Sequence, residues 1–75
     1  MGEMRTLGRE GDVKQVWDPA NADEVAAAKR VFDDLTRKGH LAFKVLDGKG
    51  KKGEQIRAFD PNAGKIILAP PMAGG

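Results

Sequence analysis

Residues 21–38 have the sequence NADEVAAAKRVFDDLTRK, which contains the strongest periodic pattern of the chain. Its apolar side chains recur at spacings of three, four and three residues, and these spacings place them on one face of a helix. The positions are Val25, Ala28, Phe32 and Leu35. Gly39 follows, and glycine often ends a helix in the left-handed conformation. We therefore predict a helix over residues 21–38, around which the rest of the fold is arranged.

Two sequence features can begin this helix. Asp18 followed by Pro19 offers a capping carboxylate with proline at the first helical position. Asn21 with Glu24 three residues later resembles a capping box, in which the two side chains satisfy backbone N–H groups of the first turn. Both starts agree with the apolar pattern.

Five shorter segments have the composition or alternation of β-strands. They are residues 3–7 and 13–17 before the helix, and residues 41–45, 55–59 and 65–69 after it. The last segment contains the apolar run Ile66-Ile67-Leu68, which indicates burial on both faces and a central position in a sheet. One helix among such strands predicts an α+β fold, with the helix packed on one face of a small mixed β-sheet.

Alternation predicts which strand residues face the helix. Leu41, Phe43 and Val45 alternate with Ala42 and Lys44, and a period of two is typical of a half-buried strand. We therefore expect the helix to pack on Leu41, Phe43, Val45, Ile56, Ile66 and Leu68.

A turn separates the last two predicted strands. Residues 60–64 have the sequence DPNAG, in which proline suits the second position of a turn. Asparagine and glycine tolerate the left-handed conformation, so Asn62 or Gly64 can take a positive φ in this turn.

Length and composition limit the classes of function. The chain has 75 residues, with 13 Lys and Arg against 11 Asp and Glu and a formal net charge of +2. We expect one domain over residues 1–69 and an extended tail over residues 70–75. No apolar run reaches the about 20 residues of a membrane helix, and none near the start resembles a secretory signal. Together with the absence of cysteine, these features predict a cytoplasmic protein without a membrane partner.

The usual catalytic side chains are scarce in this chain. Cysteine, serine and tyrosine are absent, and His40 is the one histidine. His40 follows the predicted helix end, where the helix dipole favours a histidine that has no catalytic role. Asp33 and Asp34 are adjacent on the helix, so their side chains diverge by about 100° and cannot work as a pair. We expect no enzyme activity, no metal site and no cofactor.

Cationic side chains concentrate after the helix. Residues 40–57 contain two acidic residues and five cations. The cations are Lys44, Lys49, Lys51, Lys52 and Arg57. The loop over residues 48–53 lacks the serine or threonine of a Walker A phosphate loop. The loop is therefore either a plain solvated connection or a contact for nucleic-acid phosphates. The aromatic side chains that can stack on bases are Trp17, Phe32, Phe43 and Phe59.

The last six residues, PPMAGG, form the most informative motif of the chain. Pro70 and Pro71 favour an extended polyproline conformation, which holds the following residues away from the sheet. Gly74 and Gly75 have no side chains, so this segment can enter a narrow channel and present an unhindered carboxylate.

Residues 66–75, IILAPPMAGG, resemble the C-terminal end of the ubiquitin-like sulfur carriers, which include the small subunit of molybdopterin synthase and the thiamine-pathway carrier. The resemblance implies a β-grasp fold and a Gly75 carboxylate that an ATP-dependent adenylating enzyme activates. The activated carboxyl group would become a thiocarboxylate for sulfur transfer, or would be joined to a lysine of an acceptor protein. The sequence leaves both outcomes open.

Two other classes of function remain alongside the carrier or modifier. One is a small nucleic-acid-binding module that uses the five cations of residues 40–57. The other is a structural or interaction protein, for which we expect an apolar patch on the open face of the sheet that includes Ala42, Leu46 or Phe59.

Overall fold

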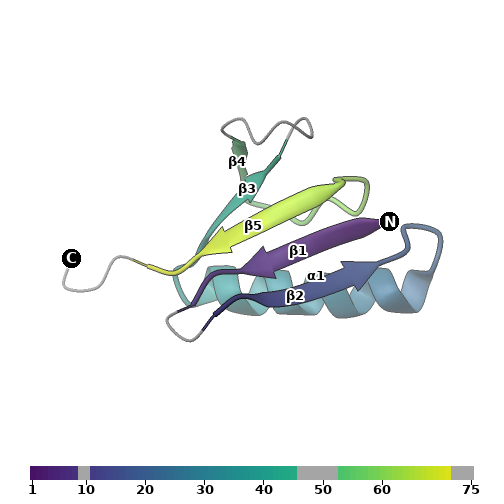
Figure 1. Ribbon diagram of the computed structural model, residues 1–75. Coiled ribbons are helices and arrows are strands. Elements are labelled where there is room, and N and C mark those ends of the chain that lie inside the picture. Colours follow the sequence, from purple (N-terminus) through teal and green to yellow (C-terminus); the bar gives the residue numbers. More distant parts are fainter. Residues whose placement is uncertain (9–10, 46–52, 72–75) are drawn as a thin grey trace.

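One helix and five strands make up the regular structure of the chain (Figure 1). The computed structural model describes residues 1–8, 11–45 and 53–71. The helix α1 is Ala22–Arg37. The strands are β1 (Gly2–Thr6), β2 (Val13–Trp17), β3 (Leu41–Lys44), β4 (Glu54–Ile56) and β5 (Lys65–Ala69). The predicted α+β class and order of elements are therefore confirmed.

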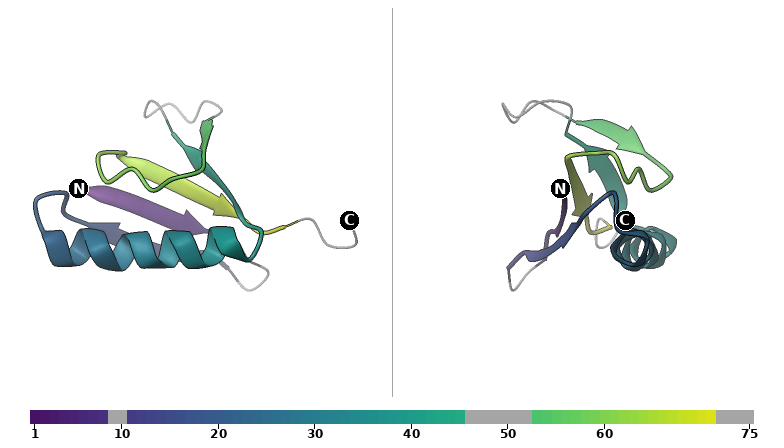
Figure 2. Two further views of the ribbon diagram at one scale, coloured as in Figure 1. Left: turned by 180° about the vertical axis from the view of Figure 1, so that it is seen from behind. Right: turned by 90° about the vertical axis from the view of Figure 1, so that its right-hand side faces the viewer.

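The strands form one mixed sheet in the order β2-β1-β5-β3-β4. β1 pairs antiparallel with β2 and parallel with β5, and β3 pairs antiparallel with both β5 and β4. Figure 2 shows α1 lying along one face of this sheet. The arrangement is consistent with a β-grasp fold, and it confirms the central position predicted for β5.

The helix begins at Asn21, the second of the two starts that the sequence allows. The Asn21 Oδ1 accepts hydrogen bonds from the N–H groups of Asp23 (3.0 Å) and Glu24 (3.2 Å). The Glu24 Oε1 accepts from the Asp18 N–H at 2.8 Å. Asp18 caps the preceding turn instead, because its Oδ1 accepts from the Ala20 N–H at 2.9 Å. The alternative with Pro19 at the first helical position is therefore wrong.

Gly39 ends the helix as predicted. Its φ of +102° lies in the region that L side chains rarely adopt. The Gly39 N–H donates to the Thr36 carbonyl and the His40 N–H donates to the Leu35 carbonyl, both at 3.0 Å. These two bonds form a Schellman motif, which satisfies carbonyl groups of the last helical turn.

The core lies between α1 and the sheet. Its buried residues are Met4, Trp17, Ala28, Phe32, Ala42, Ala63, Ile66 and Leu68. Val25 and Leu35 are partly buried against this cluster, so the predicted apolar face of the helix is confirmed. Phe59 joins the core from the segment after β4, with its ring 5.0 Å from that of Trp17 and 5.7 Å from that of Phe32.

The face predicted for β3 is wrong. Ala42 is 1% exposed in the core, whereas Leu41 is 48% exposed. Ala42 pairs with Leu68, and Phe43 with Ile67. Because paired residues share a face and neighbours alternate, Phe43 lies on the side of the sheet away from α1. Alternation in this strand did not identify the inward face, and the small Ala42 occupies the position under the helix.

The connection between β4 and β5 also differs from the prediction. β4 ends at Ile56, not at residue 59, because Phe59 leaves the sheet to pack in the aromatic cluster. In the turn, the Ala63 N–H donates to the Asp60 carbonyl at 3.1 Å. Gly11 and Gly39 are the residues with positive φ in the described ranges, so the turn does not use the left-handed conformation that Asn62 and Gly64 allow. The Trp17 Nε1–H donates to the Pro61 carbonyl at 2.9 Å and ties this turn to β2.

In the part of the chain that the structure describes, no helix is long and apolar enough to cross a membrane.

A methyl group at residue 2 should disturb the core. Gly2 is paired with Trp17, and a Cβ at this position would overlap three carbon atoms of the Trp17 indole. We expect Gly2→Ala to lower the free energy of unfolding by about 1–3 kcal/mol, measured by urea denaturation. Gly64→Ala is the matched control, because its Cβ would meet nothing within 4 Å. Equal stability of the two variants would contradict the packing of Trp17 over Gly2.

Two phenylalanines distinguish the observed core from the predicted one. Phe32 is fully buried, whereas Phe43 is half-buried on the face of the sheet away from α1, which we call the open face. We expect Phe32→Ala to cost about 3–5 kcal/mol of unfolding free energy, and Phe43→Ala clearly less. Equal losses in thermal or chemical unfolding would show that Phe43 belongs to the core after all.

Candidate functional site

The chain leaves the sheet at the C-terminal end of α1. Ala69, the last residue of β5, pairs with Leu41 at the start of β3. Pro70 and Pro71 are exposed and lie outside the strands. Pro71 lies beside Gly39, so that a Cβ on this glycine would be 3.4 Å from the Pro71 Cβ. Figure 1 shows the end of β5 next to the link between α1 and β3.

This exit is the starting point of the predicted tail. Gly74 and Gly75 lie outside the described residues, so their role stays a prediction. The contact between Pro71 and Gly39 places the base of the tail against the helix cap.

The residues predicted to contact nucleic acid are only partly described. Lys44 shares the helix side of the sheet with its partner Ile66, and its Nζ lies 3.1 Å from the Asp60 Oδ2. Arg57 is exposed directly after β4. Lys49, Lys51 and Lys52 lie outside the described residues. One of the two described cations is therefore already engaged in an ion pair.

The aromatic side chains suggested for base stacking are mostly unavailable. Trp17 and Phe32 are fully buried, and Phe59 packs against both of them. Phe43 alone of the four lies on the open face. Stacking by Trp17, Phe32 or Phe59 would therefore require the core to open.

The open face carries an apolar patch, although not the predicted one. Leu41 pairs with Ala69 and Phe43 pairs with Ile67, so these four residues share one face; we call them the open-face patch. Leu41 is 48% exposed and the other three are half-buried. The prediction of Ala42 and Phe59 is wrong because both face the core, and Leu46 lies outside the described residues.

Charged side chains cover the neighbouring part of the open face, over β1 and β2. The Glu3 carboxylate accepts a hydrogen bond from the Arg5 Nε at 2.6 Å and lies 3.8 Å from the Lys14 Nζ. The hydrogen bond from Arg5 is the main cause of a lowered pKa of Glu3. The open face is thus divided into an apolar half and an ion-paired half.

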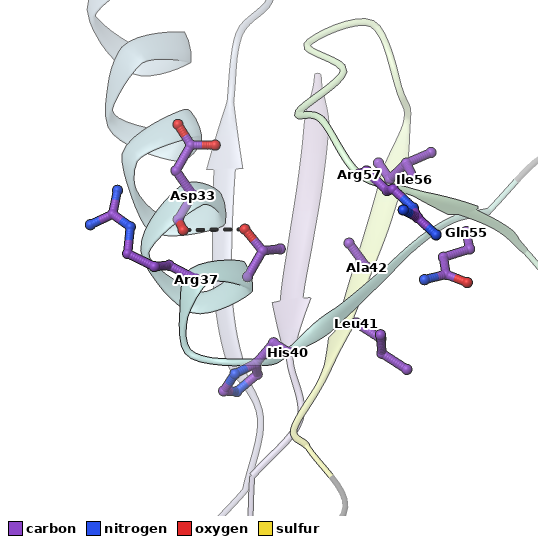
Figure 3. Close-up of a pocket in the computed structure, with 9 residues that line it drawn as sticks. Asp33, Arg37, His40, Leu41, Ala42, Gln55, Ile56 and Arg57 are labelled. Atoms are coloured by element: carbon purple, nitrogen blue, oxygen red, sulfur yellow. Dashed lines mark hydrogen bonds between the residues drawn. The ribbon is translucent and has the colours of Figure 1, made fainter.

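A pocket opens between the end of α1 and the β3–β4 edge of the sheet (Figure 3). It has a volume of about 490 Å³. Its lining residues are Asp33, Thr36, Arg37, His40, Leu41, Ala42, Gln55, Ile56 and Arg57. Sequence reasoning did not find this α1–β4 pocket, because its walls come from segments about 20 residues apart that only the fold brings together.

Comparisons with known proteins give one distant similarity. No family model matches the chain, and no solved structure matches it. The chain is 29% identical over 79 residues to a protein of Caulobacter vibrioides described as heat-inducible transcription repressor HrcA. The match covers 97% of this chain and 22% of the repressor, so the chain spans about a fifth of the length of that relative.

The Asp60 carboxylate should make stability sensitive to acid. Its pKa is lowered, first by the hydrogen bond from the Asn62 N–H and then by the one from Lys44. The unfolded chain, with an ordinary Asp pKa of about 3.9, therefore takes up the proton at higher pH than the folded protein does. We expect the thermal midpoint to fall as the pH drops below about 4, and to fall less steeply in Asp60→Asn. If the thermal midpoint falls equally steeply with pH in the two proteins, this role of Asp60 is contradicted.

Proposed function

We propose that the chain is a ubiquitin-like small carrier or protein modifier whose Gly75 carboxylate is activated by adenylation. The supporting observation is the position of β5, which lies in the centre of the sheet, parallel to β1, and runs directly into Pro70 and Pro71. Pro70 and Pro71 are exposed, so an enzyme can reach the chain at the point where it leaves the sheet.

The proposed chemistry takes place on the tail. A carboxylate oxygen of Gly75 attacks the α-phosphorus of ATP, and pyrophosphate leaves to give an acyl-adenylate. A sulfur nucleophile at the oxidation state of hydrosulfide then displaces AMP to give a thiocarboxylate. Alternatively, a lysine amine displaces AMP to give an amide. Each displacement releases one proton. Gly74 and Gly75 assist by offering no side chain to the enzyme channel.

The folded part of the chain has a positioning role in this proposal. Pro71 lies against Gly39, which restricts the direction in which the tail begins. The open-face patch reaches the base of the tail, because Ala69 immediately precedes Pro70. An adenylating enzyme that holds the tail can therefore also cover Leu41 and Ala69, and a downstream acceptor protein can use the same surface in turn.

The alternative function is a small nucleic-acid-binding or accessory module that uses Lys49, Lys51 and Lys52. Its support is the concentration of cations in residues 40–57 and the similarity to a protein described as a transcription repressor. The ion pair between Lys44 and Asp60 reduces the charge that the described part contributes.

Intact-mass analysis of the protein from its natural host tests the carrier proposal. We expect an oxygen-to-sulfur mass increase at the C-terminal residue, or larger lysine-linked conjugates. Deletion of Gly74 and Gly75 should abolish both products and leave the thermal midpoint almost unchanged, because neither residue has a side chain to pack. Gly75→Ala is the matched control and should impair activation without abolishing it, since the carboxylate remains.

The proposal fails if the protein stays unmodified with candidate adenylating enzymes and ATP present. Salt-dependent binding of an oligonucleotide by the same sample would then favour the alternative.

A further inference from the structure

The α1–β4 pocket has no part in the proposed tail chemistry. We propose that it binds an extended acidic peptide segment of a partner protein, with an apolar side chain beside Ile56 and separate carboxylates at Arg37 and at Arg57. This site does not depend on activation of Gly75.

The pocket has two apolar residues of the sheet in its lining. Ala42 and Ile56 are paired on the helix side of β3 and β4. Ala42 is 1% exposed under α1, and Ile56 is partly exposed beside it. The volume of about 490 Å³ is typical of ligand-binding pockets, which range over about 300–1,000 Å³. An aliphatic side chain would find an apolar floor there.

The charges around the pocket favour an acidic ligand. Figure 3 shows Arg37 on the last turn of the helix, with its guanidinium directed away from β4, and Arg57 just beyond β4. Neither forms an ion pair within the described residues. The one acidic residue of the lining, Asp33, is already paired with the Lys29 Nζ at 2.6 Å. A guanidinium group binds a carboxylate with two parallel hydrogen bonds, so each of these two arginines can hold one carboxylate of an extended ligand.

The lining includes one buried polar atom without a hydrogen-bond partner in the described residues. The His40 Nδ1 is buried and has no hydrogen-bond partner in the described structure, which is unusual for a buried polar atom. The Thr36 hydroxyl is engaged with the carbonyl groups of Phe32 (2.9 Å) and Asp33 (3.2 Å). The His40 Nδ1 is thus a buried polar atom of the lining that has no partner within the described residues.

The position of β4 favours a peptide over a small anion. β4 is the last strand in the sheet order, so one of its edges has no neighbouring strand in the described part of the chain. An extended segment can pair with such an edge through backbone hydrogen bonds. No aromatic side chain lines the pocket, whereas single-stranded nucleic acid is usually held by stacking on aromatic rings.

An NMR titration tests this site. The probe is a short, end-blocked peptide of alternating valine and glutamate, added to the ¹⁵N-labelled full chain. We expect the largest amide shifts at Ala42, Ile56 and their neighbours. Arg37→Gln and Arg57→Gln should each weaken binding by about fivefold, the effect of losing about 1 kcal/mol. Arg30→Gln is the control, because Arg30 is exposed on α1 outside this pocket, and it should bind within about twofold of the unchanged chain.

Three results would overturn the proposal. One is equal binding of the peptide in which glutamine replaces glutamate. Another is a shift pattern confined to the open face. The third is that N-acetylglutamate alone, or a single-stranded oligonucleotide, binds at the pocket as tightly as the peptide.

Discussion

The parallel pairing of the first strand with the last one determines where the other parts of this protein lie. Met4 is paired with Ile66, and the bonds from the Glu3 N–H to the Gly64 carbonyl (3.1 Å) and from the Leu7 N–H to the Leu68 carbonyl (2.9 Å) extend the ladder. A parallel pair needs a long crossover, and α1 lies in that crossover against the same face. Met4, Ile66 and Leu68 consequently form the floor on which Phe32 packs.

The sequence predicts the elements better than it predicts their faces. The helix pattern repeats over about three turns, and the Ile66-Ile67-Leu68 run indicates burial on both sides, so α1 and the central β5 were predictable. β3 has only four residues, and its alternation allows either face inward. The register of β3 with β5 determines which of its side chains face the helix, and that register depends on residues far apart in sequence. The burial of Trp17 likewise depends on Gly2 and Pro61, which lie far from each other in sequence.

The candidate sites also differ in whether a local sequence motif or only the fold reveals them. The PPMAGG motif is local, so the sequence alone predicts a tail, and this stays a prediction; the contact of Pro71 with Gly39 needed the fold. The sequence predicts the wrong residues for the apolar patch on the open face, because it predicts the wrong inward face for β3. The α1–β4 pocket has no local signal, since Arg37 and Arg57 line one pocket only when β3 pairs with β5 and β4. The tail base, the open-face patch and the pocket all contain or adjoin Leu41, at the start of β3.

The pairing of β1 with β5 is best tested by nuclear Overhauser effects in the ¹³C,¹⁵N-labelled protein. Cross-strand contacts between backbone protons should follow the parallel register of Met4 with Ile66 and Arg5 with Ile67. Contacts should also link the Pro71 ring with Gly39 at the point where the chain leaves the sheet. Antiparallel contacts between these strands, or a β5 that contacts only one neighbouring strand, would contradict both the topology and the position of the tail.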